Sequence, residues 1–140
     1  MPRQPQIRLV RNESSINPIN VLEGVALNAA AATRTAEINC EGYSVLRFFV
    51  FFTHSAASDV SVTPTATLDG TNYAPLQSRS IVAGAATLSD LVDTKTVTGD
   101  DQFWVDYDVR GLTTIKLAMS GTSAGASDLV TCQGCLIAEG

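Results

Sequence analysis

The residues of this sequence that could perform hydrolysis begin with its one histidine, His54, which Ser55 follows directly. A catalytic triad needs a histidine within hydrogen-bonding distance of a nucleophile and oriented by a third group. Adjacency along the chain does not by itself supply this geometry. We therefore expect His54 to be a strand-end side chain that faces solvent or an interface. No catalytic residue is assigned, and the chain is predicted not to be an enzyme.

Three cysteines, Cys40, Cys132 and Cys135, are the second candidate group, and their odd number excludes a complete set of intrachain disulfides. Cys132 and Cys135 have the Cys-x-x-Cys spacing of redox and zinc sites. In a regular strand, residues three apart point to opposite faces, so these thiols should diverge unless a bulge at Gly134 reunites them. A zinc site would need two further ligands, and only Cys40 and His54 are available. The sequence predicts reduced, buried thiols, with no metal and no cofactor.

Acidic pairs occur at Asp100-Asp101 and at Asp106 and Asp108. Calcium binding needs several oxygen ligands that converge from loops, and no calcium-loop spacing is present. A glycosidase pair also lacks any sign of a deep cleft in this sequence. We expect these carboxylates to lie on a solvated outer face.

Aromatic side chains could instead stack against sugars in a lectin-like domain; the candidates are Trp104, Tyr43, Tyr73 and Tyr107. Aromatic residues make up only 6% of the chain, and most of them are needed for a core. Carbohydrate binding therefore stays as an alternative, and it predicts an exposed aromatic side chain near Trp104.

The composition indicates one domain with an uneven charge. The chain has 140 residues, of which 45% are apolar and 16% charged, against an average of about 25% charged in soluble domains. Arg3, Arg8 and Arg11 give residues 1–11 a side-chain charge of +3, whereas the remainder has 6 basic and 14 acidic groups. An acidic body argues against a nucleic-acid partner, because phosphate contacts need clustered Lys and Arg. The basic N-terminus could dock on an acidic protein surface.

No segment of the sequence resembles a membrane span or a signal peptide. The longest apolar run, Val45 to Phe52, is interrupted by Arg47 and is less than half as long as the roughly 20 residues of a spanning helix. The first residues, Met-Pro-Arg-Gln-Pro, contain no apolar stretch. We expect synthesis in a cytoplasm without secretion, and no membrane partner.

The elements that must position these side chains are short strands that follow an extended arm. Residues 1–20 contain Pro2, Pro5 and Pro18 and lack periodicity, which predicts an arm that orders on a partner. Its apolar piece around Ile7 and Leu9 could add to a sheet edge. Strand character appears at 21–29, 33–40, 44–53, 59–68, 73–81, 94–98, 103–109, 112–119 and 129–138, with a helical turn or a loop before 94. Residues 21–140 are predicted to form a single all-β domain, a β-sandwich or jelly roll of about eight strands.

Pro64 marks the strand predicted over 59–68 as an edge strand or the site of a bulge. The segment from Ser44 to Thr53 is apolar on both faces. One face carries Leu46, Phe48, Val50 and Phe52, and the other carries Val45, Arg47, Phe49 and Phe51. A sandwich core covers only one face of a strand, so a subunit contact is expected to cover the second. The predicted interface residues are Val45, Phe49 and Phe51 together with Arg3, Ile7, Arg8, Leu9 and Arg11 of the arm.

Three stretches carry a resemblance to a known class: Thr67–Leu76 (TLDGTNYAPL), Phe103–Leu112 (FWVDYDVRGL) and the Ser120–Ser123 loop. Over about residues 45–138 the pattern resembles that of tailed-bacteriophage virion β-sandwich proteins. A short acidic domain with an extended N-terminal arm is most similar, within that class, to head decoration (cement) proteins. The resemblance implies a place on the capsid surface, with the major capsid protein and copies of the chain itself, often a homotrimer, as partners. A neck, tail or fibre protein would show the same turns and stays as an alternative.

Overall fold

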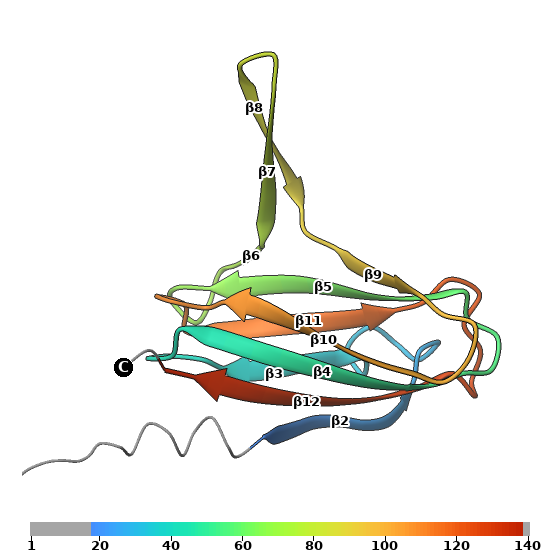
Figure 1. Cartoon of the computed structure of the whole chain (residues 1–140). Coiled ribbons are helices and arrows are strands. Elements are labelled where there is room, and N and C mark those ends of the chain that lie inside the picture. The colour runs from blue at the N-terminus through green and yellow to red at the C-terminus, as the bar shows by residue number, and fades with distance from the viewer. Residues whose placement is uncertain (1–17, 139–140) are drawn as a thin grey trace, which may run out of the picture.

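The computed structural model describes residues 18–138, which form a β-sandwich with a two-stranded hairpin projecting from it (Figure 1). These residues contain eleven strands and no helix, so the all-β prediction is confirmed. One sheet has the order β10 (Asp101–Asp108), β4 (Val45–Thr53), β12 (Leu129–Ile137), β2 (Ile19–Ala26). The other has the order β3 (Thr35–Asn39), β11 (Thr114–Ser120), β5 (Asp59–Thr67), β6 (Tyr73–Pro75), with β9 (Asp93–Thr96) also beside β5. All pairs are antiparallel.

The core lies between the two sheets and follows the period of two that the sequence shows. From β4 it receives Leu46, Phe48, Val50 and Phe52, and from β5 and β11 it receives Val60, Val62, Ile115, Leu117 and Met119. Burying each such side chain stabilises the fold by about 1.5–3 kcal/mol relative to leaving it in water. The predicted inner face of the most apolar strand is therefore confirmed.

Pro64 lies in β5 between the part that pairs with β9 and the part that pairs with β6. Residues 59–62 of β5 pair with β9, and residues 65–67 pair with β6, so Pro64 falls between the two paired stretches. Its missing N–H is tolerated in such a gap. The chain leaves the sandwich after β6 and returns to it before β9, where the Leu91 N–H donates to the Leu76 carbonyl at 2.8 Å.

The segment between β6 and β9 is a hairpin made of β7 (Gln77–Val82) and β8 (Ala85–Asp90). We expected one return strand over 73–81 and then a helical turn or a loop, and this expectation is wrong. Only Tyr73–Pro75 pairs with β5, because the chain then turns away from the sandwich. Ala83 and Gly84 both have positive φ, 53° and 80°, which is the two-residue turn whose twist suits a hairpin.

β2 departs from the regular alternation that its sequence suggests. Gly24 has a φ of 56°, and the register of β2 against β12 shifts between Val130 and Gln133. Val21 and Leu22 are consequently both half-buried, whereas Glu23 is exposed. Regular alternation along 21–29 predicts one shared face for Val21, Glu23, Val25 and Leu27. This prediction is wrong, because an irregular strand changes the side to which its residues point.

Asp128 joins two loops at one end of the sandwich. Its side chain is fully buried and accepts backbone N–H groups from Ser55 (2.6 Å), Ala56 (2.9 Å), Ala57 (3.2 Å) and Gly125 (2.8 Å). Burial alone raises the pKa of this carboxyl, but the four N–H donors outweigh it and lower the pKa to about 2. The ionised carboxylate therefore holds the 54–58 loop against the loop that precedes β12.

Candidate assembly surfaces

An aromatic cluster covers part of the outer face of the four-stranded sheet. We call it the outer aromatic face and define it by Arg47, Phe49 and Phe51 of β4 and Trp104 of β10. The strand register sets Phe49 opposite Trp104, with ring centres 6.1 Å apart, and the Phe49 and Phe51 rings stack at 6.3 Å. Trp104 is 51% exposed. These rings lie on the solvent side of the sheet, opposite the core face of the same strand.

Arg47 contacts both Asp106 and the ring of Trp104 on this face. Its guanidinium donates two hydrogen bonds of 2.9 Å to the two carboxylate oxygens of Asp106, and it lies 4.4 Å from the centre of the Trp104 ring. The hydrogen bond from Arg47 lowers the pKa of Asp106 against the opposing effect of burial. The two charges neutralise each other, so the face presents a stacked planar group with no net charge beside its rings.

A hollow of about 250 Å³ lies next to the outer aromatic face. Its lining is mainly apolar and consists of Pro18, Phe49, Phe51, Gln133, Gly134 and Cys135. Pro18 is the first residue that the structure describes.

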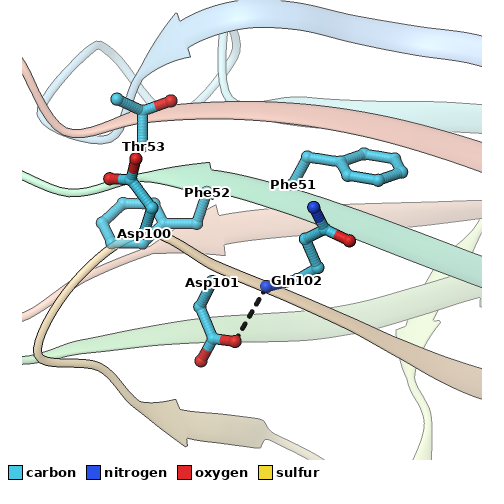
Figure 2. A pocket seen from close by; sticks show the side chains of 6 residues that line it. All are labelled: Phe51, Phe52, Thr53, Asp100, Asp101 and Gln102. Atoms are coloured by element: carbon cyan, nitrogen blue, oxygen red, sulfur yellow. Dashed lines mark hydrogen bonds between the residues drawn. The ribbon is translucent and has the colours of Figure 1, made fainter.

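A second hollow of about 480 Å³ shares Phe51 with the first (Figure 2). Phe51 lies on one side of it and Asp100 on the other, with Gln102 beside Phe51. Asp100 is exposed and accepts the His54 N–H at 2.8 Å, and within residues 18–138 it pairs with no cation. The neighbouring Asp101 is neutralised by Lys95 at 3.0 Å, and the hydrogen bond from Lys95 lowers its pKa.

The side chains considered for chemistry are separated or engaged elsewhere. The His54 ring lies 2.9 Å from the Ala57 carbonyl through its Nε2 atom, and its edge packs on Phe52. Cys132 faces the core and Cys135 the outer surface, so the predicted divergence of the two thiols is confirmed. The predicted burial is confirmed for Cys40 and Cys132 and wrong for Cys135, which is half-buried. Asp108 pairs with Arg110 at 2.8 Å. Residues 18–138 hold no group of three or more His, Cys, Asp or Glu side chains able to bind a metal.

The predicted interface residues of β4, Val45, Phe49 and Phe51, are all half-buried on its outer side. Arg3, Ile7, Arg8, Leu9 and Arg11 lie outside the described residues. In the described part of the chain, no helix is long and apolar enough to cross a membrane.

The projecting hairpin, β7 and β8, is a second surface, which the sequence reading missed. Every residue of both strands is exposed. The register gives the hairpin two different faces. One face is aliphatic toward the tip, where it carries Ile81, Ala86 and Leu88, and polar toward the base, where it carries Arg79, Gln77 and Asp90. The other is rich in hydroxyls and carries Ser78, Ser80, Thr87 and Ser89, with Val82 and Ala85 near the tip.

No known protein family matches the sequence, and no curated protein matches it. Among solved structures, the chain is similar to the crystal structure of the SPBc2 prophage-derived protein YomS. The two share 14% sequence identity and a TM-score of 0.48, over 86% of this chain and 90% of that one.

Proposed function

We propose that this chain is a structural virion protein of a tailed bacteriophage. Within that class we assign it as a capsid decoration (cement) protein, which stabilises the phage head through contacts between subunits. The observation that carries the assembly role is the outer aromatic face, where Phe49, Phe51 and Trp104 form one cluster on the solvent side of a sheet. The virion class rests on the resemblance of the turns within residues 67–76 and 103–112.

The composition of this face supports a role in binding protein. Interfaces between proteins have an apolar, aromatic centre with a polar rim, and Trp and Arg are enriched among the residues that dominate their affinity. Here Gln102 and Gln133 stand opposite Phe51 and Phe49 in the strand register, and Arg47 flanks Trp104. Burying the rings would remove apolar area from water without burying an unpaired charge, because Arg47 is already paired with Asp106.

The proposed partners are copies of the chain itself, as a homotrimer, and the major capsid protein at the capsid surface. Individually weak contacts that are repeated at symmetry-related sites give a high overall affinity through multivalency. The basic segment of residues 1–17 would tie the domain to an acidic neighbour. No enzymatic activity, cofactor or nucleic-acid partner is part of this proposal.

A carbohydrate-binding domain of a neck, tail or fibre is the second candidate, and the exposure of Trp104 is the observation that favours it. An exposed indole beside glutamine and charged side chains could stack against a sugar ring. Specific binding of the purified protein on a glycan array, lost on Trp104→Ala, would select this function.

Replacing both Phe51 and Trp104 by alanine should reduce the amount of protein on capsids at least about tenfold, because two aromatic contacts at the centre of an interface are lost. The measurement is the occupancy of purified particles assembled with the variant as the only source of the protein. Leu68→Ala is the matched control, since Leu68 is 72% exposed but lies outside the outer aromatic face. Full occupancy by the folded double variant would contradict the proposed surface.

A further inference from the structure

The projecting hairpin has an apolar face that no other residue among 18–138 covers. Ile81 and Leu88 are 65% and 63% exposed, and they lie on the same face as Arg79. The hairpin leaves the sandwich at the edge formed by β5, β6 and β9 and points away from both sheets (Figure 1). A two-stranded hairpin without further packing is at best marginally stable in water, so a contact that covers its aliphatic face would stabilise it.

Arg79 adds a cation to this face, and Asp90 of the same face is hydrogen-bonded to Gln77 at 2.7 Å. Among residues 18–138, no carboxylate pairs with Arg79. A carboxylate on a partner surface would complement this cation. A second copy of this chain supplies one at the exposed Asp100, which pairs with no cation in the described part of the chain.

We propose that the aliphatic face of the projecting hairpin of one copy docks on the outer aromatic face of a second copy. Ile81 and Leu88 enter the hollow bordered by Phe49 and Phe51, and Arg79 pairs with Asp100 in the adjoining hollow. This inference rests on the proposed assembly function, and it names the occupant of the assembly surface.

The spacing of the two surfaces fits this pairing. Residues two apart on a strand lie about 7 Å apart on the same face, so Arg79 and Ile81 present a cation and an alkyl group side by side. On the receiving copy, Phe51 borders both the apolar hollow and the hollow that contains Asp100. One face of the hairpin can thus fill the first hollow and reach the carboxylate in the second.

The contact joins two different regions of the chain, the hairpin of one copy and the sheet of the next. Such a head-to-tail interface forms a ring when the rotation between copies closes, and the ring then has a hairpin on every acceptor face. A closed homotrimer held in this way would leave no aliphatic hairpin face in water.

Cross-linking to Cys135 tests the docking directly. Cys135 lines the apolar hollow, is in no disulfide and faces outward, whereas Cys40 and Cys132 are buried. In the full-length protein, Ile81→Cys should form covalent oligomers through Cys135 under mild oxidation or with a short bis-maleimide. Val82→Cys is the matched control, because Val82 is 69% exposed but lies on the opposite face of the hairpin. Adding Cys135→Ser to Ile81→Cys should abolish the product.

A charge exchange provides the second readout. Arg79→Glu and Asp100→Lys should each raise the dissociation constant of the oligomer about tenfold, measured by sedimentation velocity. The double variant should recover most of the loss, which a merely structural role of either residue would not produce. Absence of cross-linking at position 81, equal cross-linking at 81 and 82, or no recovery in the double variant would overturn the docking. Cross-linking of Cys135 to a cysteine placed at Ile7 instead would identify the N-terminal segment as the occupant and would also overturn it.

The proposed function has a separate readout. If the docking fails while the protein is still found on phage heads, only the hairpin contact is wrong. If the cross-link forms while the protein is absent from virions, the decoration function is wrong and self-association alone remains.

Discussion

Asp128→Asn is expected to lower the free energy of unfolding by about 3 kcal/mol, because four backbone N–H groups lose the buried, charged acceptor that they share. The substitution preserves the size of the side chain, so it creates no cavity. It replaces the carboxylate that accepts from Ser55, Ala56, Ala57 and Gly125 by an amide with one acceptor oxygen and a donor group. Urea denaturation at neutral pH, followed by tryptophan fluorescence, measures the difference.

The same substitution has a defined pH dependence. The pKa of Asp128 is lowered in the fold from its ordinary 3.8 to about 2, so ionised Asp128 stabilises the protein fully above the ordinary value. This contribution is lost as the pH falls through about 2, and the wild type and Asp128→Asn should converge there. Asp108→Asn is the control, since Asp108 is an exposed partner of Arg110 and its loss should leave the unfolding midpoint nearly unchanged. Equal effects of the two substitutions would contradict the role of Asp128.

Gly121→Ala should destabilise the fold by about 2 kcal/mol, because a methyl group has no room at this position. A Cβ on Gly121 would lie 2.8 Å from the Asp59 carbonyl oxygen and 2.9 Å from Cδ1 of Leu27. The carbonyl is part of β5 and cannot move aside as a flexible side chain does, so the loop must shift.

Gly125→Ala is the matched control for this prediction, as it adds the same methyl group to the same loop. There the nearest contact is the Asp128 carboxylate at 3.8 Å, an ordinary van der Waals distance. Thermal unfolding of both variants distinguishes local crowding from a general intolerance of the loop. Similar melting temperatures for the two would contradict the close approach of Gly121 to β5.

The periodic parts of this fold could be predicted from the sequence, because burial on one side imposes alternation on a strand. The inner face of β4, from Leu46 to Phe52, and the opposite orientations of Cys132 and Cys135 follow from that period alone. The same reasoning failed for β7 and β8, where Ile81 and Leu88 show the pattern of a packed strand but have no core beneath them. Alternation identifies two faces without telling which partner covers either of them.

Contacts between distant segments were beyond prediction because they depend on strand register. The sequence places Arg47 and Phe49 on one predicted strand and Trp104 on another, and only the pairing of β4 with β10 brings them into one cluster. Asp128 gave no signal at all, since its N–H donors include residues more than 70 positions earlier in the chain. The assignment of Val45, Phe49 and Phe51 to an interface stays a prediction, and their place on the outer face of β4 is consistent with it.

The copy number of this chain in purified virions tests the decoration role most directly, and quantitative mass spectrometry against the major capsid protein measures it. A cement protein that occupies the symmetry-related joints of the shell should be present in hundreds of copies, in a fixed ratio to the capsid protein. About a dozen copies or fewer would place the protein at the neck or tail, and its absence from the particle would remove it from the virion; either result would contradict the decoration role.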